Sequence, residues 1–183
     1  IEYLNEGKIL SLVSDAGTPL ISDPGRILLN ECVKKKIKII PIPGVSSITT
    51  AFSASGFKDK FLFYGFLPKT EKELRKELAL LSEIEYSQIF FVPAIKINFY
   101  FKNFKEYFSG RKIMIAKEMT KIHETFQRED INNLNTVKSI KGEFTVVISE
   151  KISKEKKINK EKIVNKIKNY LKKYSVRDTV NLI

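Results

Sequence analysis

The amino-acid sequence predicts an α/β fold made of two α/β domains with separate cores. Short apolar segments alternate with longer amphipathic segments, which is typical of βαβ units and a parallel sheet. The loops after two of the apolar segments are rich in glycine, proline, serine and aspartate, as expected where strands end at a sheet edge. Hydrophobic residues make up 43% of the 183 residues, which is enough to form a proper core.

The first domain is expected over residues 1–57. Its predicted elements are, in order, a buried strand at 9–13, a helix at about 27–35, a second buried strand at 37–40 and a helix that ends near residue 55. Ser46 and Ser47 are suited to capping the start of the last helix, and Gly56 is suited to ending it. Strands that alternate with helices in this way predict a parallel sheet.

The second domain is expected over residues 58–150, since the sequence pattern changes after Gly56. Its predicted elements are strands at 61–66, 88–92, 112–116 and 144–149 and helices at 71–81 and 95–108. Leu74, Leu78 and Leu81 form the apolar stripe of the first of these helices. Alternating aromatic residues in the first strand favour core packing over stacking on nucleic-acid bases.

Residues 151–183 are expected to form a basic helical tail, with a helix over about 154–174. Between residues 151 and 173 there are ten lysines and two glutamates, so this stretch contributes +8 to a net charge of +12 for the whole chain. Such a block of positive charge favours binding to a polyanion. A genome rich in A and T, which favours lysine codons, is the alternative explanation.

Composition excludes several classes of protein. A single cysteine, Cys32, excludes a disulfide framework and is typical of a reducing cytoplasm, and no group of cysteines and histidines has the spacing of metal ligands. No apolar run is long enough to span a membrane, and no secretory signal opens the chain. The chain begins with Ile1 in an apparent helical pattern and ends in another, so both ends are expected to border missing sequence.

The loop at residues 14–25, SDAGTPLISDPG, is the first candidate binding site. Gly17 allows a ligand to approach the backbone closely, while Asp15, Thr18, Ser22 and Asp23 can form hydrogen bonds to an amine or a hydroxyl. The alternative is a pair of turns that only leads into the next helix.

A second loop, PIPGVSS at residues 41–47, also follows a predicted strand and opens a helix. Its backbone N–H groups and the hydroxyls of Ser46 and Ser47 can hold a polar ligand. Proline and serine are equally ordinary residues for a helix start. Two such loops at the ends of neighbouring strands favour a shared binding site.

Several stretches of the chain stand in a characteristic order and spacing. They are SDAGTPLISDPG at 14–25, PIPGVSS at 41–47, ASG at 54–56, FLFYGFLPK at 61–69, AKEMTKIHETF at 116–126 and KGEFT at 141–145. Their order and spacing resemble the ribosomal RNA methyltransferase I branch of the tetrapyrrole-methylase-like superfamily. The resemblance covers roughly residues 1–150.

The resemblance implies two α/β domains of tetrapyrrole methylase type, a class III methyltransferase, with S-adenosylmethionine in the cleft between them. It implies a homodimer that methylates the 2′-hydroxyl of a cytidine ribose in small-subunit ribosomal RNA, without a metal or a membrane. Family sequences have a further N-terminal portion with part of the cofactor cleft, so the cleft is expected to be incomplete in this chain. The expected cofactor-binding residues are Asp15, Ala16, Gly17, Thr18, Ser22, Ser46 and Ser47.

The AKEMTKIHETF stretch has the densest set of groups that can accept or donate a proton. Glu118 is the candidate general base for removing the hydroxyl proton, although an ion pair with Lys121 that orders the loop is the alternative. The expected substrate-binding residues are Lys69, Lys121, His123, Glu124 and Arg128.

One stretch departs from the family pattern. Where the family has an aromatic residue followed by Glu-Ser-Pro-His-Arg, this chain has FVPAIK at residues 91–96, and only the final basic residue is kept, as Lys96. Two alternatives therefore stay open. One is a methyltransferase of the same superfamily that acts on a tetrapyrrole or another small molecule. The other is a non-catalytic, ribosome-associated RNA-binding protein on a decayed methylase fold.

Overall fold

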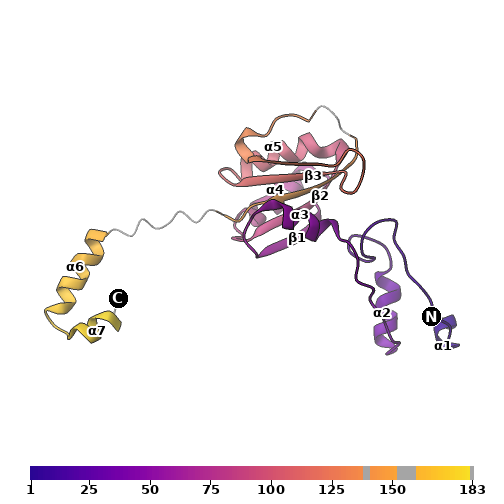
Figure 1. Ribbon diagram of the computed structural model, residues 1–183, viewed down its shortest axis with the longest axis horizontal. Coiled ribbons are helices and arrows are strands. Elements are labelled where there is room, and N and C mark those ends of the chain that lie inside the picture. The colour runs from indigo at the N-terminus through magenta and orange to yellow at the C-terminus, as the bar shows by residue number, and fades with distance from the viewer. Residues whose placement is uncertain (138–140, 152–159, 182–183) are drawn as a thin grey trace. The chain divides into compact units, whose positions relative to one another are not determined.

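The computed structural model of the chain describes residues 1–137, 141–151 and 160–181. The chain divides into two compact units, residues 1–151 and residues 152–183 (Figure 1). The first unit contains one sheet with helices on both of its faces, which confirms the predicted α/β class. No helix in the described ranges is both long enough and apolar enough to cross a membrane.

The sheet of the first unit has five strands in the order β1-β2-β5-β3-β4. The strands are β1 (Phe61–Phe66), β2 (Ser87–Pro93), β3 (Lys112–Lys117), β4 (Thr125–Asp130) and β5 (Glu143–Ile148). Only β1 and β2 are parallel, and the other three pairs are antiparallel. The parallel sheet was predicted for residues 1–57, a fully described range in which the structure has no strand. The short β3–β4 connection demands antiparallel pairing, and β5 inserts between β2 and β3 antiparallel to both.

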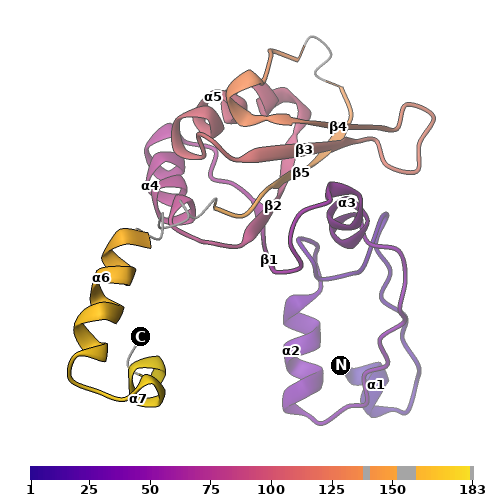
Figure 2. The same ribbon diagram turned by 60° about the vertical axis from the view of Figure 1, so that its left-hand side comes forward.

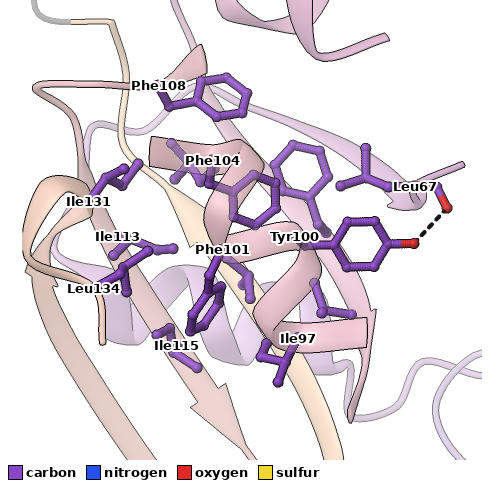
Figure 3. Close-up of a cluster of buried hydrophobic side chains, with 14 of the residues drawn as sticks. Leu67, Ile97, Tyr100, Phe101, Phe104, Phe108, Ile113, Ile115, Ile131 and Leu134 are labelled. Carbon is purple, nitrogen blue, oxygen red and sulfur yellow. Dashed lines mark hydrogen bonds between the residues drawn. The ribbon is translucent and has the colours of Figure 1, made fainter. Parts of the chain in front are cut away.

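Two helices cover one face of the sheet. They are α4 (Glu71–Ser82) and α5 (Ile97–Tyr107), and they enclose the larger hydrophobic core. Phe90, Tyr100 and Phe104 are fully buried within it, and the Tyr100 hydroxyl donates a hydrogen bond of 3.2 Å to the Leu67 carbonyl (Figure 3). This hydrogen bond ties the segment after β1 to α5.

The other face of the sheet is covered by α3 (Ser47–Ser55), as Figure 2 shows. Ala51 of α3 packs in a second, smaller core with Ile89, Met114, Ala116 and Val147 from the three central strands. Because side chains alternate between the two faces of a strand, β2, β3 and β5 contribute to both cores and are nearly continuous in apolar residues.

Most of the predicted helices are confirmed. The helix expected at 27–35 is α2 (Arg26–Lys34), and the helix expected at 95–108 consists of a 3₁₀ turn, η1 (Ala94–Lys96), followed by α5. Ser46 is the N-cap residue of α3 but makes no side-chain capping hydrogen bond. Gly56 ends α3 in the left-handed conformation with φ +73°, as its sequence position predicts. The helical pattern expected at the start of the chain is α1 (Glu2–Asn5). Two elements were not predicted, the strand β4 and the 3₁₀ turn η2 (Ile131–Asn133).

The two strands predicted before residue 57 are wrong. Residues 9–13 and 37–40 belong to no strand, and Ile9, Val13 and Ile40 are 94%, 82% and 66% exposed. An apolar run becomes a strand only when a neighbouring strand takes its backbone hydrogen bonds. Neither segment forms such a ladder with another part of the chain that the structure describes.

The second unit contains α6 (Lys160–Leu171) and α7 (Val176–Asn181). Ser175 precedes α7, and its hydroxyl oxygen accepts the Asp178 N–H at 3.2 Å, as a helix cap does. The helix predicted over 154–174 is confirmed from residue 160 onward. Its earlier part, with Lys154, Lys156 and Lys157, lies outside the described residues.

Candidate functional site

One end of the sheet gathers the loops that carry most of the predicted site residues. The parallel strands β1 and β2 both end there, at Phe66 and Pro93. Since β5 is antiparallel to β2 and to β3, it begins at this end with Glu143, opposite Pro93, while β3 ends there with Lys117. β4 begins there as well, at Thr125. We call this the site end of the sheet.

The β3–β4 loop at the site end is held by an ion-pair triad. The Lys121 ammonium lies 3.1 Å from Glu118 Oε1 and 3.0 Å from Glu143 Oε2. The Glu143 N–H donates to Glu118 Oε1 at 2.8 Å, and the Glu118 N–H donates to the Glu143 carbonyl at 3.0 Å. The alternative of a Glu118–Lys121 ion pair is therefore present in the structure.

These contacts change the acidity of the triad. The hydrogen bond from the Glu143 N–H, followed by that from Lys121, lowers the pKa of Glu118. Hydrogen bonds to Glu143 and then to Glu118 raise the pKa of Lys121. A carboxylate with a lowered pKa is a weaker proton acceptor, so the geometry favours loop ordering over general-base catalysis for Glu118.

The remainder of this loop is more open. The Glu124 carboxylate accepts the Thr120 N–H at 2.7 Å, which closes the loop on itself. His123 is exposed, and Ile122 beside it is 98% exposed. Met119 is partly buried and packs against the core under α3. The loop is therefore anchored at Met119 and presents His123 and Ile122 to its surroundings.

The loop at 14–25 consists of tight turns. The Ser14 hydroxyl donates to the carbonyls of Ala16 and Gly17 at 3.2 and 3.1 Å. Gly17 has φ +72°, and a Cβ atom at this position would find no atom within 4 Å. The space at the Cβ position of Gly17 is therefore open. Asp15 and Thr18 are exposed on either side of it.

Ser22 brings this loop to the site end. Gly65, the next-to-last residue of β1, has φ +86°, and a Cβ atom there would lie 3.2 Å from the Ser22 hydroxyl oxygen. Ser22 is itself in a left-handed conformation, with φ +63°. The sequence gives no sign of this contact, because 43 residues separate Ser22 from Gly65 along the chain.

One predicted substrate-binding residue, Arg128, makes its hydrogen bonds within the fold. The Arg128 guanidinium donates two hydrogen bonds to the Ala54 carbonyl, one of them 3.0 Å long, and so ties β4 to the end of α3. Arg128 lies opposite Met114 in the middle of β4, away from the site end. Among the described residues, the side chains of Ser46 and Ser47 form no hydrogen bond to the loop at 14–25.

Lys69 and the departing stretch both lie at the site end. Lys69 is exposed, and its carbonyl accepts a hydrogen bond of 3.4 Å from Lys96, whose ammonium is 5.2 Å from the centre of the Phe99 ring. Val92 is buried in the larger core, while Ile95 is 78% exposed. The departure from the family pattern therefore changes the surface of the candidate site and not only the core.

An aromatic group next to Gly65 was not predicted as part of the site. The Phe63 and Phe66 rings lie 5.0 and 5.4 Å from the Phe91 ring, and Phe66 remains 54% exposed. Alternation along β1 suggested core packing, but a register shift between Phe63 and Gly65 changes the alternation at this end. An irregularity of this kind is visible only in the paired strands.

Other features of the described chain point to no further site. A hollow of about 670 Å³ is lined by Ile1, by Asp23, Pro24 and Gly25 at the end of the loop at 14–25, and by residues at the start of α2. It therefore adjoins the first candidate loop. Within the described ranges, no group of three or more His, Cys, Asp or Glu residues is arranged to hold a metal ion.

Comparisons with known proteins show the family to which the chain belongs. Residues 1–135 match the family model of the tetrapyrrole (corrin/porphyrin) methylases. Three curated relatives carry the name ribosomal RNA small subunit methyltransferase I. The relative from Thermotoga maritima is 40% identical over 82% of this chain and 69% of its own length. The relative from Rickettsia prowazekii is 39% identical over 83% of this chain and 56% of its own length. The relative from Mesomycoplasma conjunctivae is 36% identical over 83% of this chain and 64% of its own length.

Solved structures share the fold. The methyltransferase CobJ superposes with a TM-score of 0.62 at 18% identity, covering 81% of this chain and 67% of its own. A cobalt precorrin-4 methyltransferase superposes with a TM-score of 0.55 at 15% identity, covering 81% and 66%. The predicted fold class is thus confirmed. The chain belongs to the tetrapyrrole methylase family, in the branch of the ribosomal RNA small subunit methyltransferases I.

Proposed function

We propose that the protein uses S-adenosylmethionine to methylate the 2′-hydroxyl of a cytidine ribose in small-subunit ribosomal RNA. The observation that carries the proposal is the identity of 36–40% to relatives named ribosomal RNA small subunit methyltransferase I. We further propose that residues 1–57 belong to an N-terminal α/β domain, residues 58–150 form the second domain and residues 151–183 form a basic tail.

The cofactor assignment is supported by the loop at 14–25. A solved uroporphyrin-III C-methyl transferase, similar in fold with a TM-score of 0.50 at 11% identity, is complexed with S-adenyl homocysteine. In this chain the open backbone at Gly17 and the polar side chains of Asp15, Thr18 and Ser22 fit such a ligand, which has an amine, a carboxylate and ribose hydroxyls. Bound there, the cofactor would supply an electrophilic methyl group.

The protein must hold the accepting hydroxyl in line and remove its proton. We assign the positioning to the site end of the sheet, where the β3–β4 loop and the loop at 14–25 both contribute side chains. Glu118 is a poor proton acceptor because its pKa is lowered. His123 is exposed in the same loop and can form a hydrogen bond to the substrate.

A row of lysines supports an RNA substrate. Across the site end, in the order of the strands, lie Lys69 after β1, Lys96 after β2, Lys141 before β5 and Lys117 at the end of β3. In the part of the chain that the structure describes, none of the four forms an ion pair with a carboxylate. Positive charge in a row of this kind attracts a nucleic-acid backbone.

The opposite end of the sheet differs. Lys58 lies 3.8 Å from Glu150, and Lys151 lies 2.9 Å from Glu83, so lysines there are offset by carboxylates. The site end also has a paired lysine, Lys121, but its four lysines without an ion pair among the described residues favour a polyanionic ligand. The identity to relatives named for ribosomal RNA favours RNA as that ligand. Ribosomal RNA is found in ribosomal subunits, so we also propose that the protein acts in the cytoplasm. Following the resemblance to the family, we propose that it acts as a homodimer.

The test is methylation of isolated small ribosomal subunits by the full-length protein with radiolabelled S-adenosylmethionine, followed by mapping of 2′-O-methyl groups. We expect one methylated cytidine, absent from RNA of cells that lack the gene. A Gly17→Leu variant should lose cofactor binding and activity, while its melting temperature falls only by the roughly 2–8 °C that a residue other than glycine costs at a positive φ. Methylation of a tetrapyrrole alone, or RNA binding without any methylation, would support one of the two alternatives instead.

A further inference from the structure

The β3–β4 loop has a conformation that must be held in place. Glu118 and Thr120 have φ +52° and φ +67°, in the left-handed region that residues other than glycine rarely adopt. Two such residues within three positions store strain, and strain of this kind persists only where surrounding contacts enforce it. It is concentrated in proteins at sites where geometry matters for function.

The contacts that enforce this conformation come from β5. Glu118 and Glu143 exchange hydrogen bonds, each through its N–H, at 3.0 and 2.8 Å. Lys121 then bridges both carboxylates at 3.1 and 3.0 Å, and its own N–H donates to the Glu118 carbonyl at 3.0 Å. Together, Glu118, Lys121 and Glu143 form what we call the latch.

Gly142 makes room for the latch. It has φ +101°, and a Cβ atom at this position would lie 2.8–2.9 Å from three atoms of the Glu118 side chain. Any larger residue would therefore push the Glu118 carboxylate out of its place against the Glu143 N–H. The close approach of this backbone to Glu118 explains why a glycine stands immediately before β5.

The latch fixes the residues at the tip of the loop. Ile122 and His123 lie between Lys121 in the latch and Glu124, whose carboxylate accepts the Thr120 N–H. Both tip side chains are exposed, Ile122 to 98%. The loop extends beyond the end of the sheet, as Figure 2 shows between β3 and β4. A rigid loop that presents an apolar side chain and an imidazole suits contact with an unstacked base and its ribose.

We propose that Glu118, Lys121 and Glu143 are positioning residues that hold the loop so that Ile122 and His123 contact the RNA substrate. The inference rests on the proposed function. It assigns Glu118 no proton transfer, and it gives the tip a direct role in substrate binding. The apolar side chain packs on a base or ribose face, and the imidazole stacks or forms a hydrogen bond.

The experiment compares Lys121→Met with a matched control in the full-length protein. Arg75 bridges Glu71 and Glu106 at 3.1 and 3.0 Å, so Arg75→Met breaks a triad of the same charges and distances on α4 and α5. We expect Lys121→Met to raise KM for small ribosomal subunits about tenfold, equal to about 1.4 kcal/mol, without changing the affinity for cofactor. Arg75→Met should leave both constants unchanged, and Lys121→Arg should restore most of the loss.

A double-mutant cycle separates the latch from a general effect on stability. If the latch acts through the tip, adding Lys121→Met to Ile122→Ala/His123→Ala should not raise KM further, because the tip side chains that bind RNA are already removed. Multiplying effects would overturn the proposal, and so would an unchanged KM in Lys121→Met. A rise in KM for Arg75→Met equal to that for Lys121→Met would also overturn it.

Hydrogen exchange tests the latch without any activity assay. We expect the amides of residues 119–124 to exchange about tenfold faster in Lys121→Met than in the wild type, since a loop without its latch opens more often. Equal exchange rates would overturn the proposal. If the wild-type protein methylates no RNA, the proposed function fails, and the exchange rates still report whether the latch holds the loop.

Discussion

Replacing Gly65 with alanine tests whether Ser22 belongs to the cofactor site. An alanine Cβ would lie 3.2 Å from the Ser22 hydroxyl oxygen, closer than most side-chain contacts allow, so the exposed serine must move by a few tenths of an ångström or rotate away. Gly110 provides a matched control. It has φ +80°, close to the φ +86° of Gly65, but a Cβ atom there would meet no atom within 4 Å.

The two substitutions should cost the same stability and differ in binding. Placing alanine at a positive φ costs about 1–2 kcal/mol at either site, or roughly 2–8 °C in melting temperature for a chain of this size. Only Gly65→Ala displaces the Ser22 hydroxyl. If that hydroxyl forms a hydrogen bond to the cofactor, its loss weakens binding by about 0.5–1.5 kcal/mol, or roughly 2- to 12-fold in Kd.

The assay is titration calorimetry of S-adenosylhomocysteine with the full-length protein, alongside thermal unfolding. Ser22→Ala should weaken binding as much as Gly65→Ala does, and the two changes together should weaken it no further, because both remove the same contact. The reasoning is refuted if Gly65→Ala and Gly110→Ala lower the melting temperature equally and leave Kd equal to the wild-type value.

Three further predictions concern stability, pH and the basic segment. Arg111 is 4% exposed, and its guanidinium donates hydrogen bonds to the carbonyls of Ser82, Ile84 and Ser149. Arg111→Met removes these hydrogen bonds and should lower the free energy of unfolding, measured by urea denaturation, by on the order of 3 kcal/mol. A decrease below about 1 kcal/mol would mean that water replaces these hydrogen bonds. The pKa of Glu118 is lowered in the folded protein, so its contribution to stability is present above the ordinary glutamate pKa and is lost as pH falls through the lowered value. The difference in unfolding free energy between wild type and Glu118→Gln should therefore be greatest near neutral pH and disappear on acidification. A difference that stays constant with pH would contradict this prediction. If the segment 151–173 contacts RNA phosphates, Lys→Gln changes at positions 156, 157, 160 and 162 should weaken binding to all RNA sequences alike. They should also reduce the slope of log K against log salt concentration by about 0.7–0.9 for each phosphate that is no longer neutralised. An unchanged slope would attribute these lysines to composition.

Most of the elements between residues 58 and 150 were predictable because their signals are local. The stripe of Leu74, Leu78 and Leu81 follows the period of one helix, and each of the three is buried as that period requires. The helix end at Gly56 depends on the conformational freedom of a single residue. The family was predictable for a different reason, since its motifs are contiguous stretches that need no folded structure to be read.

Tertiary structure decided which of the predicted residues meet. β4 has only one partly buried apolar side chain, Phe126, so its sequence carries no strand signal, and its pairing with β3 defines it. Arg128 was a reasonable RNA contact from its charge, but the end of α3 lies within its reach and takes both of its hydrogen bonds. Neither outcome depends on neighbours in the sequence.

The sequence by itself determined the α/β class, most of the helices and strands after residue 57 and the family, because periodicity, helix ends and motifs are encoded within short stretches. Only the tertiary structure decided the order of the strands, the approach of Ser22 to Gly65 and the pairing of Glu118 with Glu143. It also decided that the apolar runs at 9–13 and 37–40 are not strands. The physical reason is the same in each case: a hydrogen bond between distant residues depends on which partner the fold brings within about 3 Å, and no local pattern specifies that partner.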